Sequence, residues 1–97
     1  MDFKNRRMIT AGVDLMVNPL LQIFMWHCID SMPKPKDYLQ VFTCSGFDGK
    51  QKITHIQEEE PEYKREYLFQ TDAPIFVGKN FVIDDETHST MLLAAEY

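Results

Sequence analysis

Apolar and polar residues alternate along the middle of the chain with the two-residue period of β-strands. Residues 38–45 and 51–58 show this alternation, and the segment 45–50 between them combines two glycines with an aspartate, a composition typical of tight turns. We therefore predict an antiparallel hairpin. Two further strands are predicted over residues 63–69 and 75–83.

The hairpin defines which side chains share a face. Residues opposite each other in an antiparallel pair point to the same side, and side chains alternate between sides along each strand. One predicted face carries Phe42, Cys44, Ile53 and His55. The other carries Leu39, Val41, Thr54 and Ile56. Both faces are partly apolar, so the pattern leaves open which one receives a helix; we adopt the arrangement in which the first face lies beneath it.

A helix is predicted before the hairpin. Asn18 suits the N-cap and Pro19 suits the first helical position, and the prolines after Met32 end the helix. Apolar residues nearly surround this helix, which indicates burial on more than one side or an interface. The stripe predicted to face the core consists of Leu20, Leu21, Phe24 and Cys28. Met25 and Trp26 are candidates for a contact surface, with burial in the core as the alternative.

The two ends of the chain are less regular. Residues 6–13 are predicted as a short strand in which Gly12 marks a bulge or a close approach. Residues 88–95 fit a strand or a short helix, and we predict a strand. The chain of 97 residues is then a single α+β domain, with one N-terminal helix on a mainly antiparallel sheet of about five to six strands.

Composition places the chain among globular proteins. Apolar residues make up 44% of it, and no apolar segment is long enough to span a bilayer. No secretory signal is visible, so we expect a cytoplasmic protein that does not associate with membranes. Its two cysteines should then be reduced thiols, available for burial or metal binding.

Charge adds a candidate binding face. The chain has 15 acidic and 10 basic residues, a net charge of −5, which argues against direct nucleic-acid binding and permits docking on a basic protein. Its acids cluster in two predicted turns, and aromatic residues lie near them or in the hairpin. The residues predicted to contact a partner are Glu58, Glu59, Glu60, Glu62, Tyr63, Tyr67, Phe47, Asp84, Asp85 and Glu86. The alternative is that these turns simply face solvent.

Histidine and cysteine suggest a metal site. Cys44 and His55 are predicted as diagonal neighbours on one sheet face, and a helix above them would add His27 or Cys28, giving ligands of the types that zinc prefers. Adjacent helical residues diverge by 100°, so both are not expected on one ion. Two alternatives remain open: buried cysteines with a hydrogen-bonded histidine, and a divalent cation at Asp84-Asp85-Glu86 with His88.

No catalytic signature accompanies these residues. Cys44 and His55 could form a nucleophile–base pair, but no third orienting group or oxyanion loop accompanies them. The two glycines of the hairpin turn do not form a phosphate-binding loop. We therefore expect a protein that is not an enzyme.

Several segments carry a family resemblance. RRMITAGV, LLQIFMW, YLQVF, QKITHIQEEEPEYKREY and FVIDDETHSTMLLAAEY follow one another as in a family of small proteins from Gram-positive bacteria and their prophages, named for a staphylococcal protein of unknown function. The motifs HIQE-x-x-PEY and STMLLA-x-EY are the more specific parts. His55 matches its motif, whereas His27, Cys28 and Cys44 depart from the usual pattern. The resemblance implies a compact α+β fold, a cytoplasmic setting in a bacterial host cell and no particular activity.

The resemblance also suggests a class of function. Some small phage proteins of such hosts are anti-CRISPR inhibitors of a DNA-targeting nuclease. We therefore expect a non-enzymatic inhibitor that binds a nucleic-acid enzyme such as Cas9 through its acidic face and blocks DNA loading or cleavage. The alternative is a cytoplasmic regulatory or interaction domain, zinc-stabilised or not, and either monomeric or a homodimer that uses the exposed side of the Trp26 helix.

Overall fold

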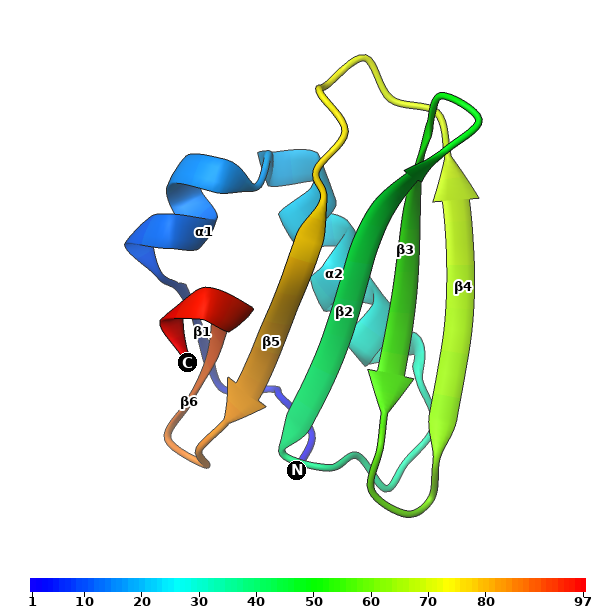
Figure 1. Cartoon of the computed structure of the whole chain (residues 1–97). Coiled ribbons are helices and arrows are strands. Elements are labelled where there is room, and N and C mark those ends of the chain that lie inside the picture. Colours follow the sequence, from blue (N-terminus) through cyan, green and yellow to red (C-terminus); the bar gives the residue numbers. More distant parts are fainter.

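A computed structural model that describes all 97 residues shows two helices on one face of a six-stranded sheet (Figure 1). The elements are β1 (Arg6–Ile9), α1 (Ala11–Met16), α2 (Pro19–Ser31), β2 (Leu39–Phe47), β3 (Lys50–Gln57), β4 (Tyr63–Phe69), β5 (Gly78–Asp84), β6 (His88–Leu93) and a 3₁₀ turn, η1 (Ala94–Glu96). The strand order is β1-β6-β5-β2-β3-β4, and β1 with β6 is the one parallel pair. The predicted α+β class is confirmed.

The hairpin has the predicted register. Cys44 pairs with Ile53 and Phe42 pairs with His55, although the strands extend further into the turn than the pattern indicates. Asp48 and Gly49 alone make the turn, with φ values of 52° and 74°. Positive φ at both central residues is the geometry of the type I′ turn, which matches the twist of paired strands.

The N-terminal strand is shorter than predicted. It ends at Ile9, and residues 11–13 are helical, because the Thr10 hydroxyl accepts a hydrogen bond from the Val13 N–H at 3.2 Å and caps α1. Gly12 marks a close approach, one of its two predicted roles, since a Cβ there would lie 2.6 Å from Glu96 Oε2. The predicted strand over 88–95 is confirmed as far as Leu93, where η1 follows.

Helix α2 begins as predicted but buries a different face. Asn18 Oδ1 accepts a hydrogen bond from the Leu21 N–H at 3.0 Å, and Pro19 is the first helical residue. The buried residues are Leu21, Met25, Cys28 and Ile29. Leu20 is 71% exposed, so its predicted place in the core is wrong. An apolar periphery gives the helix no single preferred face, and contact with the sheet decides the orientation.

The core lies between the helices and the sheet. Phe42, Cys44, Ile53 and His55 are all buried on this side, as the adopted arrangement requires. In Figure 1, α2 crosses behind the sheet, and neither α1 nor α2 lies on the face turned to the viewer; the short η1 turn borders that face beside β6. We call that uncovered side the open face. No helix in the structure has both the length and the apolar character needed to cross a membrane.

Candidate functional site

His55 belongs to a buried chain of polar side chains. Gln57 Oε1 accepts a hydrogen bond from Gln40 Nε2 at 2.7 Å, and Gln40 Oε1 lies 2.8 Å from His55 Nε2, which therefore carries the donated proton. The imidazole stacks on the Phe42 ring at 4.4 Å, and its Nδ1 has no hydrogen-bond partner. Burial, helped by the positive charge of Lys36, lowers the pKa of His55 to about 4, so the ring is neutral.

The two cysteines are free and buried. Burial raises the pKa of the Cys28 thiol to about 11 and that of the Cys44 thiol to about 12, so both remain protonated at neutral pH. A protonated thiol is a poor nucleophile and a poor metal ligand. These positions therefore act as small apolar core residues.

The structure does not bring the four predicted metal ligands together. His27 lies on the exposed side of α2, with its Nε2 3.3 Å from the Ser31 hydroxyl, while Cys28 points into the core. No group of three or more histidine, cysteine, aspartate or glutamate side chains is close enough to hold an ion. The 100° divergence of adjacent helical residues separates His27 from Cys28, and His55 Nε2 is hydrogen-bonded to Gln40 Oε1.

The two acidic turns lie at the same end of the sheet. The β3–β4 and β5–β6 turns both lie at the lower end in Figure 1, although residues of β4 and β5 separate them in the sequence. Six carboxylates in these turns are exposed. We call this set the acidic end; it comprises Glu58, Glu59, Glu60, Glu62, Asp85 and Glu86.

Asp84 is not part of that surface. Its side chain is buried, and it accepts hydrogen bonds from the Phe3 and Glu86 backbone N–H groups and from Asn5 Nδ2, at 2.8–3.0 Å. Asp84 thus holds the N-terminal segment and the β5–β6 turn in place. Asp85, beside it, is exposed, and its Oδ1 accepts hydrogen bonds from the backbone N–H groups of Thr87 and His88, which hold the turn.

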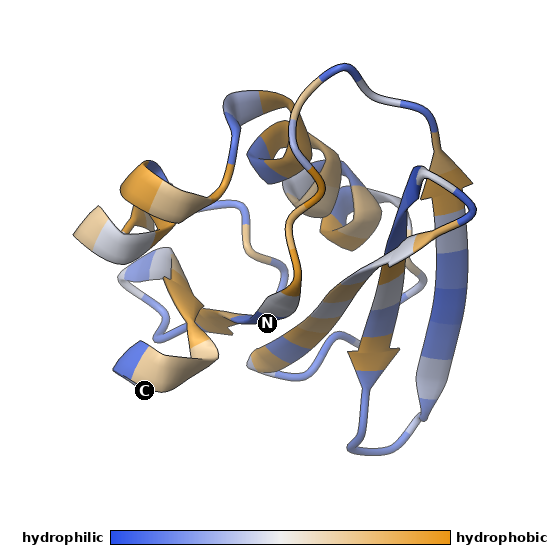
Figure 2. Cartoon of the chain, turned by 45° about the horizontal axis from the view of Figure 1, so that its top comes forward, coloured by the Kyte–Doolittle hydropathy of each residue, from blue (hydrophilic) through white to orange (hydrophobic).

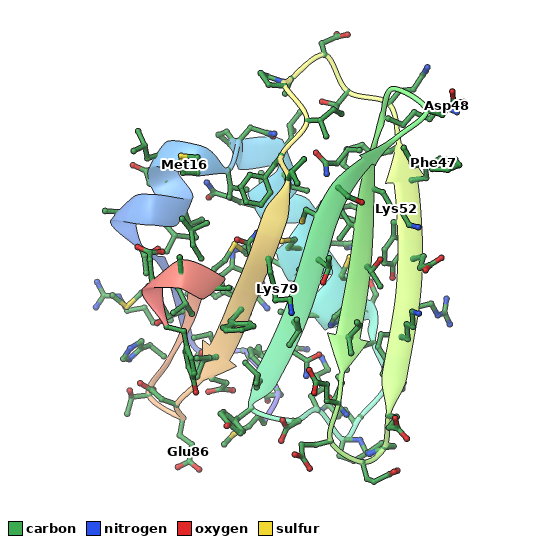
Figure 3. The ribbon with its side chains drawn as sticks, viewed as in Figure 1. Met16, Phe47, Asp48, Lys52, Lys79 and Glu86 are labelled. Atoms are coloured by element: carbon green, nitrogen blue, oxygen red, sulfur yellow. The ribbon has the colours of Figure 1, made fainter.

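The three predicted aromatic contacts lie in different places. Phe47 is 59% exposed in the β2–β3 hairpin, at the end of the sheet opposite Glu86 (Figure 3). Tyr67 faces α2, with its ring 5.1 Å from that of Phe24, and burial raises its pKa to about 12. Tyr63 is half-buried with its ring edge against His55. None of them joins the acidic end as an exposed aromatic group.

A cavity of about 850 Å³ lies beside the acidic end. Asp2, Lys4, Asn5, Lys34, Lys36 and Glu86 are among its lining residues. The Lys36 side chain is only 5% exposed and has no hydrogen-bond or ion-pair partner within contact distance, and burial lowers its pKa. The composition near Pro33 and Pro35 gave no sign that this lysine would be covered.

Helices α1 and α2 also present apolar side chains to solvent. The exposed fractions are 83% for Leu15, 57% for Met16, 71% for Leu20 and 64% for Ile23. Figure 2 shows apolar colouring on both α1 and α2. We call these four residues the helical patch. Such clustering exceeds the single exposed apolar residues that are normal on a protein surface.

Comparison with known proteins identifies relatives whose function is not known. A family model described as "Staphylococcal protein of unknown function (DUF960)" matches residues 6–96. A crystal structure of a protein of unknown function from Enterococcus faecalis aligns with a TM-score of 0.83 and 24% sequence identity, over 100% of this chain and 96% of that one. This similarity shows a shared fold. No curated protein matches the chain.

Proposed function

We propose that this chain, which belongs to the DUF960 family of staphylococcal proteins of unknown function, is a non-enzymatic binding protein that docks on a basic surface of a protein partner through its acidic end. The partner class that we propose is a nucleic-acid enzyme, with Cas9 as the first candidate. Occupation of a basic DNA-binding groove by carboxylates would compete with DNA for the same side chains.

The acidic end is the observation that carries this proposal. Four exposed carboxylates come from the β3–β4 turn and two from the β5–β6 turn. In the strand order β2 alone lies between the β5–β6 pair and the β3–β4 pair, so the centres of the two turns are three strand spacings apart, roughly 15 Å at a spacing of about 4.8 Å. Charges spaced over such a width favour a broad protein surface over a small cation.

The buried titratable groups support a role in binding rather than catalysis. The two thiols are protonated in the core, and the His55 ring is neutral and covered. A nucleophile or general base has to reach its substrate within hydrogen-bond distance. These side chains meet no solvent and therefore no substrate.

Charge reversal tests the proposal. Glu58→Lys, Glu59→Lys and Glu60→Lys together should weaken binding to a Cas9–guide complex by at least about tenfold at low salt and flatten its salt dependence, because the steering charges are lost. Asp14→Lys, Glu66→Lys and Asp72→Lys together change the net charge equally at exposed positions away from the acidic end and form the control. Binding is measured by biolayer interferometry and inhibition by cleavage of target DNA.

Two results would contradict it. If the unmodified chain neither binds the complex nor slows cleavage, Cas9 is the wrong partner. If the control triple weakens a detectable interaction as much as the acidic-end triple does, the acidic end is not the docking surface, and the effect arises from net charge alone.

The helical patch favours a second candidate, a regulatory or interaction domain that forms a homodimer. Leu20 and Ile23 lie one turn apart on the exposed side of α2, and α1 adds Leu15 and Met16. A two-fold contact between copies would bring these apolar side chains against one another. This candidate needs no acidic end and is tested separately through the oligomeric state.

A further inference from the structure

The open face of the sheet is basic although the chain is acidic. The pairing register shows which side chains share this face: Lys79 lies opposite Thr43, Thr43 opposite Thr54, and Thr54 opposite Glu66. Their sequence neighbours Asn80, Phe42 and His55 are buried toward the helices. Because side chains alternate along a strand, Lys79 and its row point away from the helices.

By the same alternation, half of the basic residues of the chain point to the open face. They are Arg6 in β1, Lys50 and Lys52 in β3, Lys64 in β4 and Lys79 in β5. Glu66 is the one acidic strand residue on this side. The face therefore holds five bases and one acid, and the rest of the chain holds five bases and fourteen acids.

Aromatic side chains accompany these bases. Phe47 is 59% exposed, and Lys52 Nζ lies 6.0 Å from the centre of its ring. Further along the face, the Phe81 ring meets the edge of Tyr97 at 5.2 Å, and Tyr97 is 72% exposed. In Figure 3, Lys52 and Lys79 project from the sheet toward the viewer, with Phe47 above them near the hairpin.

We propose that the open face binds single-stranded nucleic acid. Lysines spaced across an antiparallel sheet provide contacts for successive phosphates; Lys52 and Lys79 are about 12 Å apart by strand spacing and rise. Exposed rings provide stacking surfaces for unpaired bases, as on other sheets that bind single strands. This proposal does not depend on the function proposed above, because it uses another surface and the opposite charge.

Other occupants fit the face less well. A second copy would bring lysines against lysines in a two-fold contact, which is unfavourable. A duplex keeps its bases stacked inside, so Phe47 and Tyr97 would have nothing to stack on. An acidic polypeptide would satisfy the lysines but leave the exposed rings without a function.

Fluorescence anisotropy with a labelled oligothymidylate of about 20 nucleotides tests the proposal. With about four phosphate contacts, affinity should fall roughly 50-fold when salt rises fourfold from about 50 mM, since the logarithmic slope is about −0.7 per contact. Lys52→Ala with Lys79→Ala should reduce this slope by about 1.4. The matched control, Lys4→Ala with Lys34→Ala, removes the same charge beside the acidic end and should leave the slope unchanged.

A Phe47→Ala variant distinguishes the contribution of base stacking to oligonucleotide binding from that of charge. It should weaken oligothymidylate binding by about tenfold, because one base loses its stacking partner. The salt slope should stay the same. Circular dichroism of each variant confirms that the fold is retained.

Four results would overturn the proposal. They are no detectable binding at about 25 mM salt, equal affinity for a duplex of the same length, an equal loss in the Lys4 and Lys34 control, and displacement by polyglutamate at equal charge without an effect of Phe47→Ala. The last result would assign the face to an acidic polypeptide. Glu58→Lys, Glu59→Lys and Glu60→Lys together should bind the oligonucleotide at least as well as the unmodified chain, so failure of one proposal does not decide the other.

Discussion

The His55 side chain lies between the ring of Phe42 and the amide of Gln40, where the neutral imidazole is stable and the imidazolium is not. Its Nδ1 faces no acceptor that would bind an added proton. Protonation would place a charge in the core without a counter-ion, near the Lys36 ammonium that further disfavours it. His55 is therefore a packed core residue, and its protonation at low pH would destabilise the folded state.

Stability should fall in mild acid because of this residue. The unfolded chain binds a proton at His55 near pH 6.5 and the folded chain near pH 4, so the unfolded state holds more protons between these values. The contribution of His55 to the free energy of unfolding is therefore fully present above pH 6.5, and the free energy of unfolding decreases by about 3 kcal/mol as the pH falls to about 4. Urea unfolding at a series of pH values measures this.

A His55→Gln variant should show a flatter pH dependence over that window, because glutamine can still donate to Gln40 and does not titrate. His27→Gln, on the exposed side of α2, should keep the slope of the unmodified chain. Parallel curves for His55→Gln and the unmodified chain would mean that other groups cause the acid sensitivity.

At the scale of elements, α1 and η1 are held together by one carboxylate. Glu96 Oε1 accepts hydrogen bonds from the Thr10 hydroxyl at 2.7 Å and from the Leu93 N–H at 2.9 Å. Gly12 leaves room for this carboxylate next to the helix backbone. Because Gly12 has no side chain, the Glu96 carboxylate can approach closely and link the start of α1 to the end of β6.

The effect of Gly12→Ala should depend on Glu96. In the unmodified chain the added Cβ displaces the carboxylate, so lost hydrogen bonds offset the gain in helix propensity, and stability should fall by about 1 kcal/mol or less. With Glu96→Ala already present, the same change should raise stability by about 1 kcal/mol. Urea unfolding of the four proteins closes the double-mutant cycle. Additive effects would show that the contact is unimportant.

Some elements could be predicted from sequence because a local signal and the tertiary structure agree. Asp48-Gly49 suits the turn that paired strands require, and Asn18-Pro19 suits a helix start, so both appear where predicted. The N-terminal strand was overextended because Thr10 caps a helix that apolar alternation does not reveal. The orientation of α2 was missed because nearly every side of it is apolar.

The candidate sites were harder to predict because they depend on strand order. The two acidic turns lie at one end of the sheet because β3 and β5 are both antiparallel to β2 and therefore end at the same edge. The sequence alone does not give this strand order. The four predicted metal ligands do not come together, since His27 is exposed on α2 while Cys28, Cys44 and His55 are buried. The basic open face could not be predicted because its basic residues are spread over four strands, alternate with buried residues, and become neighbours only through strand pairing.

At the scale of the whole molecule, net charge describes this chain poorly. A value of −5 argues against nucleic acid as a direct partner, but it averages an acidic end with a basic sheet face. A ligand meets one surface at a time, and the field near that surface governs its approach. The molecule can therefore present opposite charges to two partners.

The helical patch gives a prediction at this same scale. Leu20→Glu with Ile23→Glu should abolish self-association without loss of stability, because both side chains are already in solvent. Leu68→Glu, exposed at 45% on the open face, is the control. Sedimentation velocity over a concentration series measures the oligomeric state. An unmodified chain that stays monomeric at every concentration would exclude the homodimer.

The pairing of β1 with β6 has a consequence for synthesis. β1 is the first of the six strands to be translated and its partner β6 is the last of them, and β1 lies at the sheet edge with no other strand beside it. A nascent chain on the ribosome can form the β2–β3 hairpin early, whereas β1 has no strand partner until β6 has been translated. The synthesis of β6 thus decides when the sheet is complete.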